Sequence, residues 1–189
     1  MERKSQQWNE PQWVALYTKP RAEKKVDANL KKQGFESYLP LHRQLHKWSD
    51  RNKWVEVPLF SSYVFVRIVS KQIDLIRKTD GVATIVAFGP TRDTIGFISD
   101  EEITNIRRLL ATETEVFVTR TEQLKKGSRV RVIEGPLKGM EGILLKDCSE
   151  GNFSVKVDTL SAYIVCQIEK DLLEIVTDDG KDKGIWHKQ

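Results

Sequence analysis

Basic and aromatic side chains are interleaved between Leu41 and Trp54, more densely than elsewhere in the sequence. The segment contains His42, Arg43, His46, Lys47, Trp48, Arg51, Lys53 and Trp54, with Asp50 as its one acidic residue. Cationic side chains contact phosphates, and aromatic rings stack on bases. Turn-forming residues at 49–52 predict a long β-hairpin whose tip projects into solvent. We therefore predict that Arg43, Lys47 and Arg51 contact nucleic acid.

Catalytic and metal sites are not indicated by the remaining reactive side chains. His42 and His46 have no third ligand beside them, so a metal site is not expected. Cys148 and Cys166 lack a C-x-x-C spacing and are expected to be reduced thiols of a cytoplasmic protein. Hydrolase motifs and nucleotide-binding fingerprints are missing from the sequence. We expect no enzymatic activity, no cofactor and no metal.

The composition is that of a globular chain that works by binding. Its 189 residues are 39% hydrophobic and 31% charged, enough for one ordinary domain or two small ones. The net charge of +4 permits contact with nucleic acid without requiring it. Apolar runs are too short for a membrane span, and residues 1–11 form a polar leader without the apolar core of a secretory signal.

The densest apolar run reads P-L-F-S-S-Y-V-F-V, from Pro58 to Val66, and predicts a core strand over 63–68. Alternation places Tyr63 and Phe65 on one face of this strand and the valines on the other. The valine face suits packing against helices. The aromatic face is either covered by another element, in a strand buried on both sides, or forms a binding patch.

The first part of the chain predicts an α+β domain. The expected order is strand, helix, strand, strand, helix, strand, at 12–18, 20–34, 35–39, 63–68, 71–79 and 82–88, followed by a helix capped by Ser99 and ending at Leu110. This order is typical of a ferredoxin-like layer, with helices on one side of an antiparallel sheet.

After residue 111 the composition changes. Residues 111–124 are rich in Thr and Glu and predict a linker. Short strands follow at 129–133, 141–146, 153–157, 162–168 and 173–176, which predicts a small β-barrel. Leu160, Ile164, Ile168 and Leu172 also recur at helical spacing, but β-forming residues around Ile164 favour the strand. The expected divisions are a leader at 1–11, domains at 12–112 and 124–177, a linker at 113–123 and a flexible tail at 178–189.

Two signatures resemble one protein family. P-L-F-x-x-Y-V-F-V, downstream of W-V-A-L-Y-T, is similar to the NusG family of transcription elongation factors, in particular its RfaH-like and capsule-operon (UpxY-like) antiterminators. G-S-R-V-R-V-I-E-G-P-L-K-G-M-E-G, from Gly127 to Gly142, resembles a KOW motif. The resemblance spans residues 12–177. It implies an NGN domain, an SH3-like KOW barrel, and an antitermination factor acting on a capsule or other polysaccharide operon. The RfaH resemblance also admits a helical form of the second domain that masks the first.

The resemblance further implies binding residues and partners. An apolar depression for the β′ clamp helices of RNA polymerase would be formed by Tyr17, Tyr63, Phe65, Ile85 and Phe88. The non-template DNA strand would face Lys19, Lys25, Lys78 and Thr79. The segment Gln72–Asp74 matches the region that reaches the β-subunit gate loop, but without the RfaH threonine motif, and Asp80 replaces a basic residue. The KOW domain would recruit a small-subunit ribosomal protein or Rho. A monomer without membrane contact is expected.

Other functional classes fit part of the sequence. KOW barrels also occur in ribosomal proteins, so the chain could be an RNA-binding module linked to translation, with the basic hairpin gripping RNA. A two-domain adaptor would explain the fold but leave the hairpin and the clustered aromatics without a role. The aromatic face of the first domain separates these hypotheses, because only polymerase binding uses it.

Overall fold

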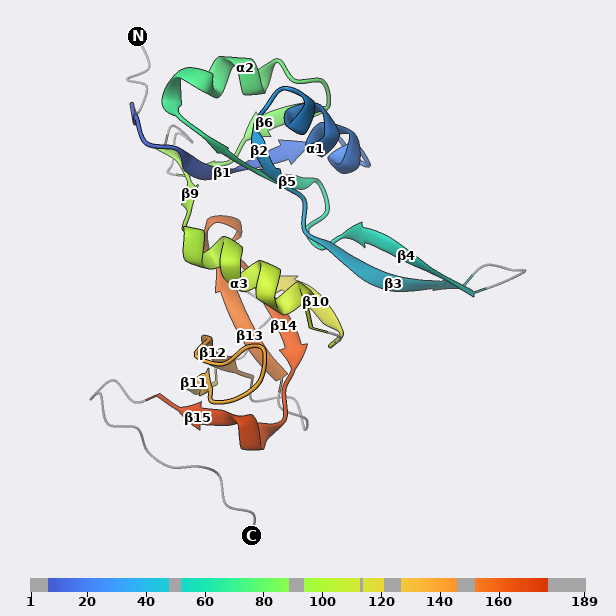
Figure 1. Ribbon diagram of the computed structural model, residues 1–189, viewed down its shortest axis with the longest axis vertical. Coiled ribbons are helices and arrows are strands. Elements are labelled where there is room, and N and C mark those ends of the chain that lie inside the picture. Colours follow the sequence, from blue (N-terminus) through green and yellow to red (C-terminus); the bar gives the residue numbers. More distant parts are fainter. Residues whose placement is uncertain are drawn as a thin grey trace. The chain divides into compact units, whose positions relative to one another are not determined.

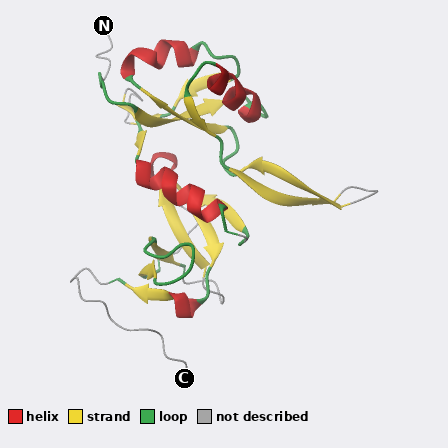
Figure 2. Cartoon of the chain, viewed as in Figure 1, coloured by secondary structure: helices red, strands yellow, loops and turns green. Residues whose placement is uncertain are grey.

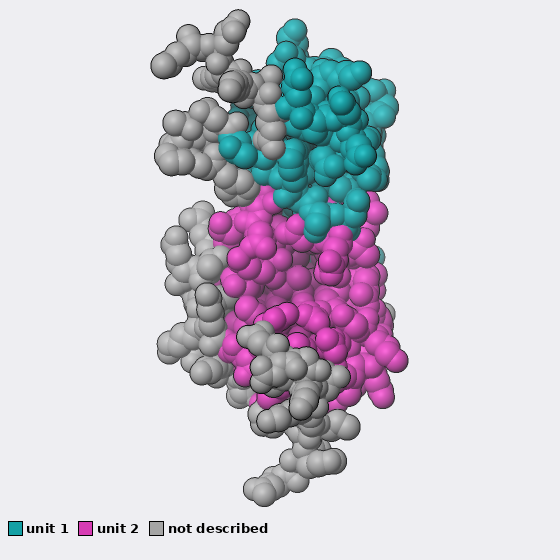
Figure 3. Space-filling view, turned by 90° about the vertical axis from the view of Figure 1, so that its left-hand side faces the viewer, with its two compact units in different colours: residues 1–100 teal, residues 101–189 magenta. Residues whose placement is uncertain are grey.

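The structure, a computed structural model, describes residues 7–47, 52–88, 94–112, 114–120, 127–145 and 152–176. The chain divides into two units, residues 1–100 and 101–189, coloured separately in Figure 3. No helix within the described ranges is long and apolar enough to span a membrane.

The sheet of the first unit is built on two adjacent antiparallel strands, β1 (Gln12–Thr18) and β5 (Tyr63–Ile68). Both have the bounds that the sequence predicts. The order of the sheet is β2-β5-β1-β6, with β2 (Glu36–Tyr38) and β6 (Val82–Ile85) on the outside. A short strand, β9 (Phe97–Ile98), also pairs with β1. The expected α+β fold with an antiparallel sheet is confirmed (Figure 2).

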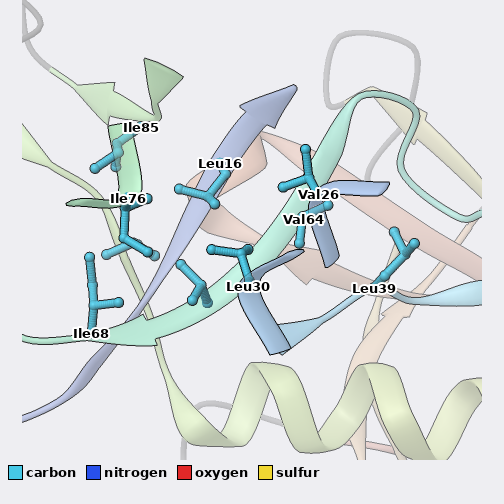
Figure 4. Close-up of a cluster of buried hydrophobic side chains, with 10 residues drawn as sticks. Leu16, Val26, Leu30, Leu39, Val64, Ile68, Ile76 and Ile85 are labelled. Atoms are coloured by element: carbon cyan, nitrogen blue, oxygen red, sulfur yellow. The ribbon is translucent and has the colours of Figure 1, made fainter. Parts of the chain in front are cut away.

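Two helices cover one face of this sheet: α1 (Glu23–Lys32) and α2 (Ile73–Arg77), the latter preceded by the 3-10 turn η1 (Ser70–Gln72). The resulting core, drawn in Figure 4, comprises Val14, Leu16, Val26, Leu30, Leu39, Val64, Val66, Ile68, Ile76 and Ile85. Val26 and Leu30 are four residues apart and face the sheet from the same side of α1, as their spacing predicts. Burial of these aliphatic side chains removes apolar surface from water and stabilises the layer.

The predicted hairpin forms a separate two-stranded sheet of β3 (Leu41–Lys47) and β4 (Asn52–Pro58), which extends away from the main sheet of its unit (Figure 1). Its residues pair in continuous register from Leu41–Pro58 to Lys47–Asn52. The strand predicted over 82–88 is divided, because β6 ends at Ile85 and Ala87–Phe88 (β7) pairs instead with Thr94–Ile95 (β8).

The second unit contains α3 (Asp100–Leu110) and a six-stranded antiparallel sheet. The strand order is β10-β14-β13-β12-β11-β15, formed by Val116–Arg120 (β10), Arg129–Val132 (β11), Glu141–Leu144 (β12), Asn152–Val157 (β13), Ala162–Gln167 (β14) and Leu173–Ile175 (β15). The strand interpretation of 162–168 is confirmed. Single 3-10 turns at Asp158–Leu160 (η3) and Lys170–Leu172 (η4) account for the helical spacing around it.

The segment expected to be a linker contains a strand of this sheet. β10 pairs with β14 over five residues, from Val116–Cys166 to Arg120–Ala162. Val116 is buried and Phe117 is half exposed. A strand at the edge of a sheet buries only part of its side chains, so a polar composition does not exclude it.

Helix α3 is attached to two turns of the second unit. The Arg108 guanidinium donates hydrogen bonds to the carbonyl oxygens of Pro136 (3.0 Å) and Lys138 (2.7 Å), and the Glu102 carboxylate accepts one from the Asp158 amide (3.1 Å). Gly135 and Gly139, at the two ends of the turn that Arg108 contacts, have φ of 79° and 82°, as glycine in a tight turn allows. The first unit therefore ends at Asp100, before the domain boundary at residue 112 that the sequence suggests. That sequence-based boundary stays a prediction.

Cys166 lies in β14 as a buried free thiol. Burial raises its pKa to about 12, because the thiolate would lose its hydration. The thiol is therefore protonated and unreactive near neutral pH, as expected of a packing residue. Cys148 lies outside the described residues.

Candidate functional site

A partly exposed pair of tyrosines lies on the face of the first sheet opposite to α1 and α2. Tyr17 on β1 is directly across from Tyr63 on β5, and their rings meet edge to face with centroids 5.4 Å apart. Tyr17 is 42% exposed, and Tyr63 is partly buried. Neighbouring residues Leu16 and Val64 point into the helix-covered core, so alternation directs this tyrosine pair outward.

Phe65 lies on the same face but has no exposed surface. Its ring contacts Phe60 at 5.8 Å and Tyr38 at 6.3 Å between centroids. Phe65 is therefore a packed residue beside the tyrosine pair, and Tyr17 and Tyr63 are the predicted anchors that present surface to solvent. A charge at Phe65 would disturb the fold before it tested binding.

Ile85 does not share this face, which corrects the sequence-based prediction. It pairs with Leu16, is 4% exposed and belongs to the helix-side core (Figure 4). The residue of β6 across from Tyr17 is Thr84, which is exposed. Phe88 lies in β7, away from the main sheet, and its side chain is outside the described part of the chain.

A basic rim is formed beside the sheet by Lys19, Lys25 and Lys78, all exposed. Neither Lys19 nor Lys78 forms an ion pair with a described residue. Lys25 donates to the Asp80 carboxylate at 2.6 Å. Thr79, predicted to face DNA, is 6% exposed, and its hydroxyl makes long contacts of 3.4–3.5 Å with Gln33 and the Leu75 carbonyl. The rim therefore consists of the three lysines without Thr79.

The hairpin presents a second exposed apolar pair. Leu45 and Trp54 are directly across from each other on β3 and β4, and they are 41% and 62% exposed. Arg43 and Lys53 are exposed on the same ribbon. The sequence indicated base stacking for this segment without singling out Trp54. Arg51 and the side chain of Lys47 are outside the described residues.

The base of the hairpin is fixed to α1 and is extended by one further backbone bond between its own two segments. The Leu59 amide donates to the Pro40 carbonyl at 2.9 Å, and the Lys24 ammonium donates to the Glu56 carbonyl at 2.8 Å. Next to it lies a pocket of about 540 Å³, lined by Arg21, Glu23, Lys24, His42, Gln44, Glu56, Val57, Pro58, Leu59 and Ser61.

Arg21 has an unusual backbone conformation, with φ of 61°. The Ala22 amide bonds to the Lys19 carbonyl at 3.1 Å, so Pro20 and Arg21 are the two central residues of a tight turn. A left-handed residue at the second central position is normally Gly or Asn, and an arginine there is strained. Its exposed guanidinium has no bonded partner among the described residues. The strained backbone and the exposed guanidinium add Arg21 to the cationic residues of the candidate nucleic-acid surface. The order of residue types in the sequence did not indicate this conformation.

Residues 11–107 match the family model of NusG, described as transcription termination factor NusG. The chain belongs to the NusG family. The matched residues include the tyrosine pair, the rim and the hairpin. Membership of the family that the two signatures resemble is therefore confirmed.

One solved structure agrees with this NusG-family fold. The structure reported as domain interaction in Thermotoga maritima NusG superposes with a TM-score of 0.53 at 20% identity, over 88% of this chain and 98% of that one. Two conformations of the MjSpt4:Spt5 complex match with TM-scores of 0.29 and 0.30, at 18% and 19% identity, over 87% and 91% of this chain and 98% and 99% of theirs. No curated protein sequence matches.

The segment Gln72–Asp74, which the family resemblance assigned to the gate-loop contact, has mainly local bonds. The Gln72 side chain accepts a hydrogen bond from the Val69 amide at 2.9 Å, which closes the turn before α2. Asp74 is exposed and lies 3.8 Å from Arg77. Leu75 beside it is 52% exposed, an apolar group that the sequence did not single out. Within the described ranges no three His, Cys, Asp or Glu side chains gather into a metal-binding group.

Proposed function

We propose that this NusG-family protein is a transcription elongation and antitermination factor that binds RNA polymerase at the β′ clamp helices. The tyrosine pair carries the proposal. Tyr17 and Tyr63 form a partly exposed aromatic patch on a sheet whose other face is packed against helices, within the residues matched to the family. Large aromatic side chains on a rigid support are typical anchors at protein interfaces.

The proposed mechanism is a shift in the equilibrium between polymerase states. A factor that contacts the β′ clamp, with the β gate loop as a further contact near Gln72–Asp74, would hold the polymerase closed around nucleic acid. It suppresses pausing and termination if it binds the elongating state more tightly than the paused one. No chemical step is needed.

The basic rim and the hairpin supply the proposed contact with non-template DNA. Lys19, Lys25 and Lys78 offer cations for phosphates, and Trp54 with Arg43 offers a stacking ring beside a cation. The long basic hairpin supports a specialised, operon-specific factor, for a capsule or other polysaccharide operon. The second unit would recruit a further partner, a small-subunit ribosomal protein or Rho.

The test is retention of core RNA polymerase by tagged full-length protein. Wild type is expected to retain polymerase, and Tyr17→Asp to reduce affinity by about 30-fold or more, since a buried unpaired carboxylate replaces an interface anchor. Ala83→Asp is the matched control, because it adds the same charge at an exposed position of β6.

Equal retention of wild type, Tyr17→Asp and Ala83→Asp would contradict the proposed surface. Wild-type protein that binds structured RNA and no polymerase would instead support the translation-linked module. Circular dichroism of each variant checks that the sheet is intact.

A further inference from the structure

The basic rim contains an ion pair between one of its lysines and a carboxylate of the same protein. Lys25 of α1 donates a hydrogen bond to Asp80 at 2.6 Å, and both side chains are 66% exposed. Lys19 and Lys78, the other rim lysines, have no ion-pair partner among the described residues. Lys25 is thus the one rim lysine whose ammonium already faces a carboxylate of a described residue.

Backbone packing holds Asp80 in this place. The next residue, Gly81, has φ of 93°, and a Cβ there would lie 2.8 Å from a methyl carbon of Val26. The Gly81 carbonyl also accepts a hydrogen bond from the Lys19 amide at 2.9 Å. The Asp80–Gly81 turn is therefore pressed against α1 and tied to the residue that begins the rim. Asp80 is beside Lys25 because the turn is fixed, rather than because two flexible side chains meet by chance.

Asp80 is ionised under all ordinary conditions. The hydrogen bond and charge of Lys25, and then the charge of Lys19, lower the pKa of its carboxyl group. The carboxylate thus interacts with two of the three rim lysines. A phosphate that approaches Lys25 meets a negative charge, and it must displace that charge to form the same hydrogen bond.

We propose that Asp80 is an intramolecular competitor of nucleic-acid phosphate at Lys25, and that it sets the affinity of the rim for nucleic acid below that of an unopposed lysine cluster. The proposal rests on the nucleic-acid contact of the proposed function. Its consequence is a protein that binds free DNA weakly and depends on the polymerase contact to place its rim against the strand. A removable competitor limits attachment to unrelated nucleic acid, where affinity comes from phosphate charge alone.

The test is binding of the full chain to a fluorescein-labelled, mixed-sequence single strand, followed by anisotropy between 25 and 200 mM salt. Asp80→Asn is expected to tighten binding by about three- to five-fold, the range of an exposed ion pair. Its plot of log affinity against log salt is expected to steepen by about 0.7, one additional phosphate contact on a single strand.

Two further variants make the result specific. Asp74→Asn removes the same charge from α2, where Asp74 is exposed and 3.8 Å from its partner, and is expected to change affinity less than the Asp80 variant. Lys25→Gln is expected to weaken binding, and adding Asp80→Asn to Lys25→Gln is expected to restore little, because the competed cation is gone.

Three results would contradict either the competitor role of Asp80 or the nucleic-acid contact. Wild type that binds the strand with the same affinity as Asp80→Asn overturns the competitor role and leaves the DNA contact intact. Equal tightening by Asp80→Asn with and without Lys25 also overturns it, since net charge alone would then explain the effect. Absence of binding by every variant at the lowest salt overturns the nucleic-acid contact itself, and the competitor role with it.

Discussion

The first unit exposes two apolar pairs across neighbouring strands, and they differ in what lies beneath them. Tyr17 and Tyr63 belong to central strands of a sheet with a helix-covered core on its other face, and Phe65 beside them on the same face is fully buried. Leu45 and Trp54 belong to a two-stranded ribbon that pairs with no other described strand. The tyrosine pair is therefore part of a packed sheet, whereas Leu45 and Trp54 lie on a hairpin that extends away from that sheet.

This difference separates two kinds of recognition. A supported aromatic patch keeps its shape without its partner and suits docking of a structured protein surface, because little ordering is required on binding. A two-stranded ribbon is marginal by itself and is held here at its base by the hydrogen bond from Lys24 of α1 to the Glu56 carbonyl. A ring on such a ribbon, beside exposed cations, suits stacking on flexible single strands.

The largest expected effect tests the packing of Phe65 beside the tyrosine pair. Phe65→Ala should lower the free energy of unfolding by about 3–5 kcal/mol, because it empties a closely packed aromatic site. Leu45→Ala should change it by about 0.5 kcal/mol, as at an exposed position. Denaturation followed by tryptophan fluorescence reports mainly on this unit, which holds Trp8, Trp13, Trp48 and Trp54 of the five tryptophans. Similar losses in both variants would show that the ribbon is as firmly packed as the sheet.

The second prediction separates the partners of the two pairs. Trp54→Ala should weaken single-strand binding by about 1–2 kcal/mol through lost stacking, and leave polymerase retention unchanged. Tyr17→Ala should give the opposite pattern. Anisotropy and polymerase pull-down on the same two preparations measure both. Loss of polymerase retention in Trp54→Ala would contradict this separation, because both pairs would then contact the polymerase.

The smallest effect concerns Arg21, between the rim and the hairpin. Arg21→Gly should weaken single-strand binding about two-fold, since one phosphate contact is lost, and leave stability within about 0.5 kcal/mol, because relief of the left-handed strain offsets the greater freedom of the unfolded chain. Arg21→Ala should weaken binding equally but be less stable than the glycine variant. Unchanged binding in both would remove Arg21 from the nucleic-acid surface.

Strands with dense apolar alternation were predictable, and the central pair shows why. β1 and β5 have the predicted bounds because each buries one face against helices and needs valine, leucine or isoleucine at every second position. The same alternation placed each tyrosine on the face of its strand opposite to the aliphatic residues, and the family resemblance assigned the two tyrosines to one surface. The basic hairpin and its turn followed from composition.

The family resemblance assigned Ile85 and Thr79 to binding surfaces, but the structure buries both side chains, for a reason that one-dimensional patterns do not contain. The pairing of β1 with β6 is irregular between Tyr17 and Thr18, and register decides that Ile85 meets Leu16 on the core side. Thr79 is polar, but a buried polar residue with hydrogen-bond partners looks the same in sequence as an exposed one. The strained φ of Arg21 and the Lys25–Asp80 contact also arise only from three-dimensional placement.

Strand β10 affects how the second unit could be separated from the rest of the chain. A fragment that begins at residue 124, at the boundary the sequence suggests, would lack Val116–Arg120 and leave one side of β14 unpaired. That strand carries Ala162, Tyr163, Ile164, Val165 and Cys166, all buried in the full chain. An open edge of this composition is a template for pairing between molecules, so such a fragment should aggregate. A fragment that begins before Val116 would keep the edge covered and should remain monomeric.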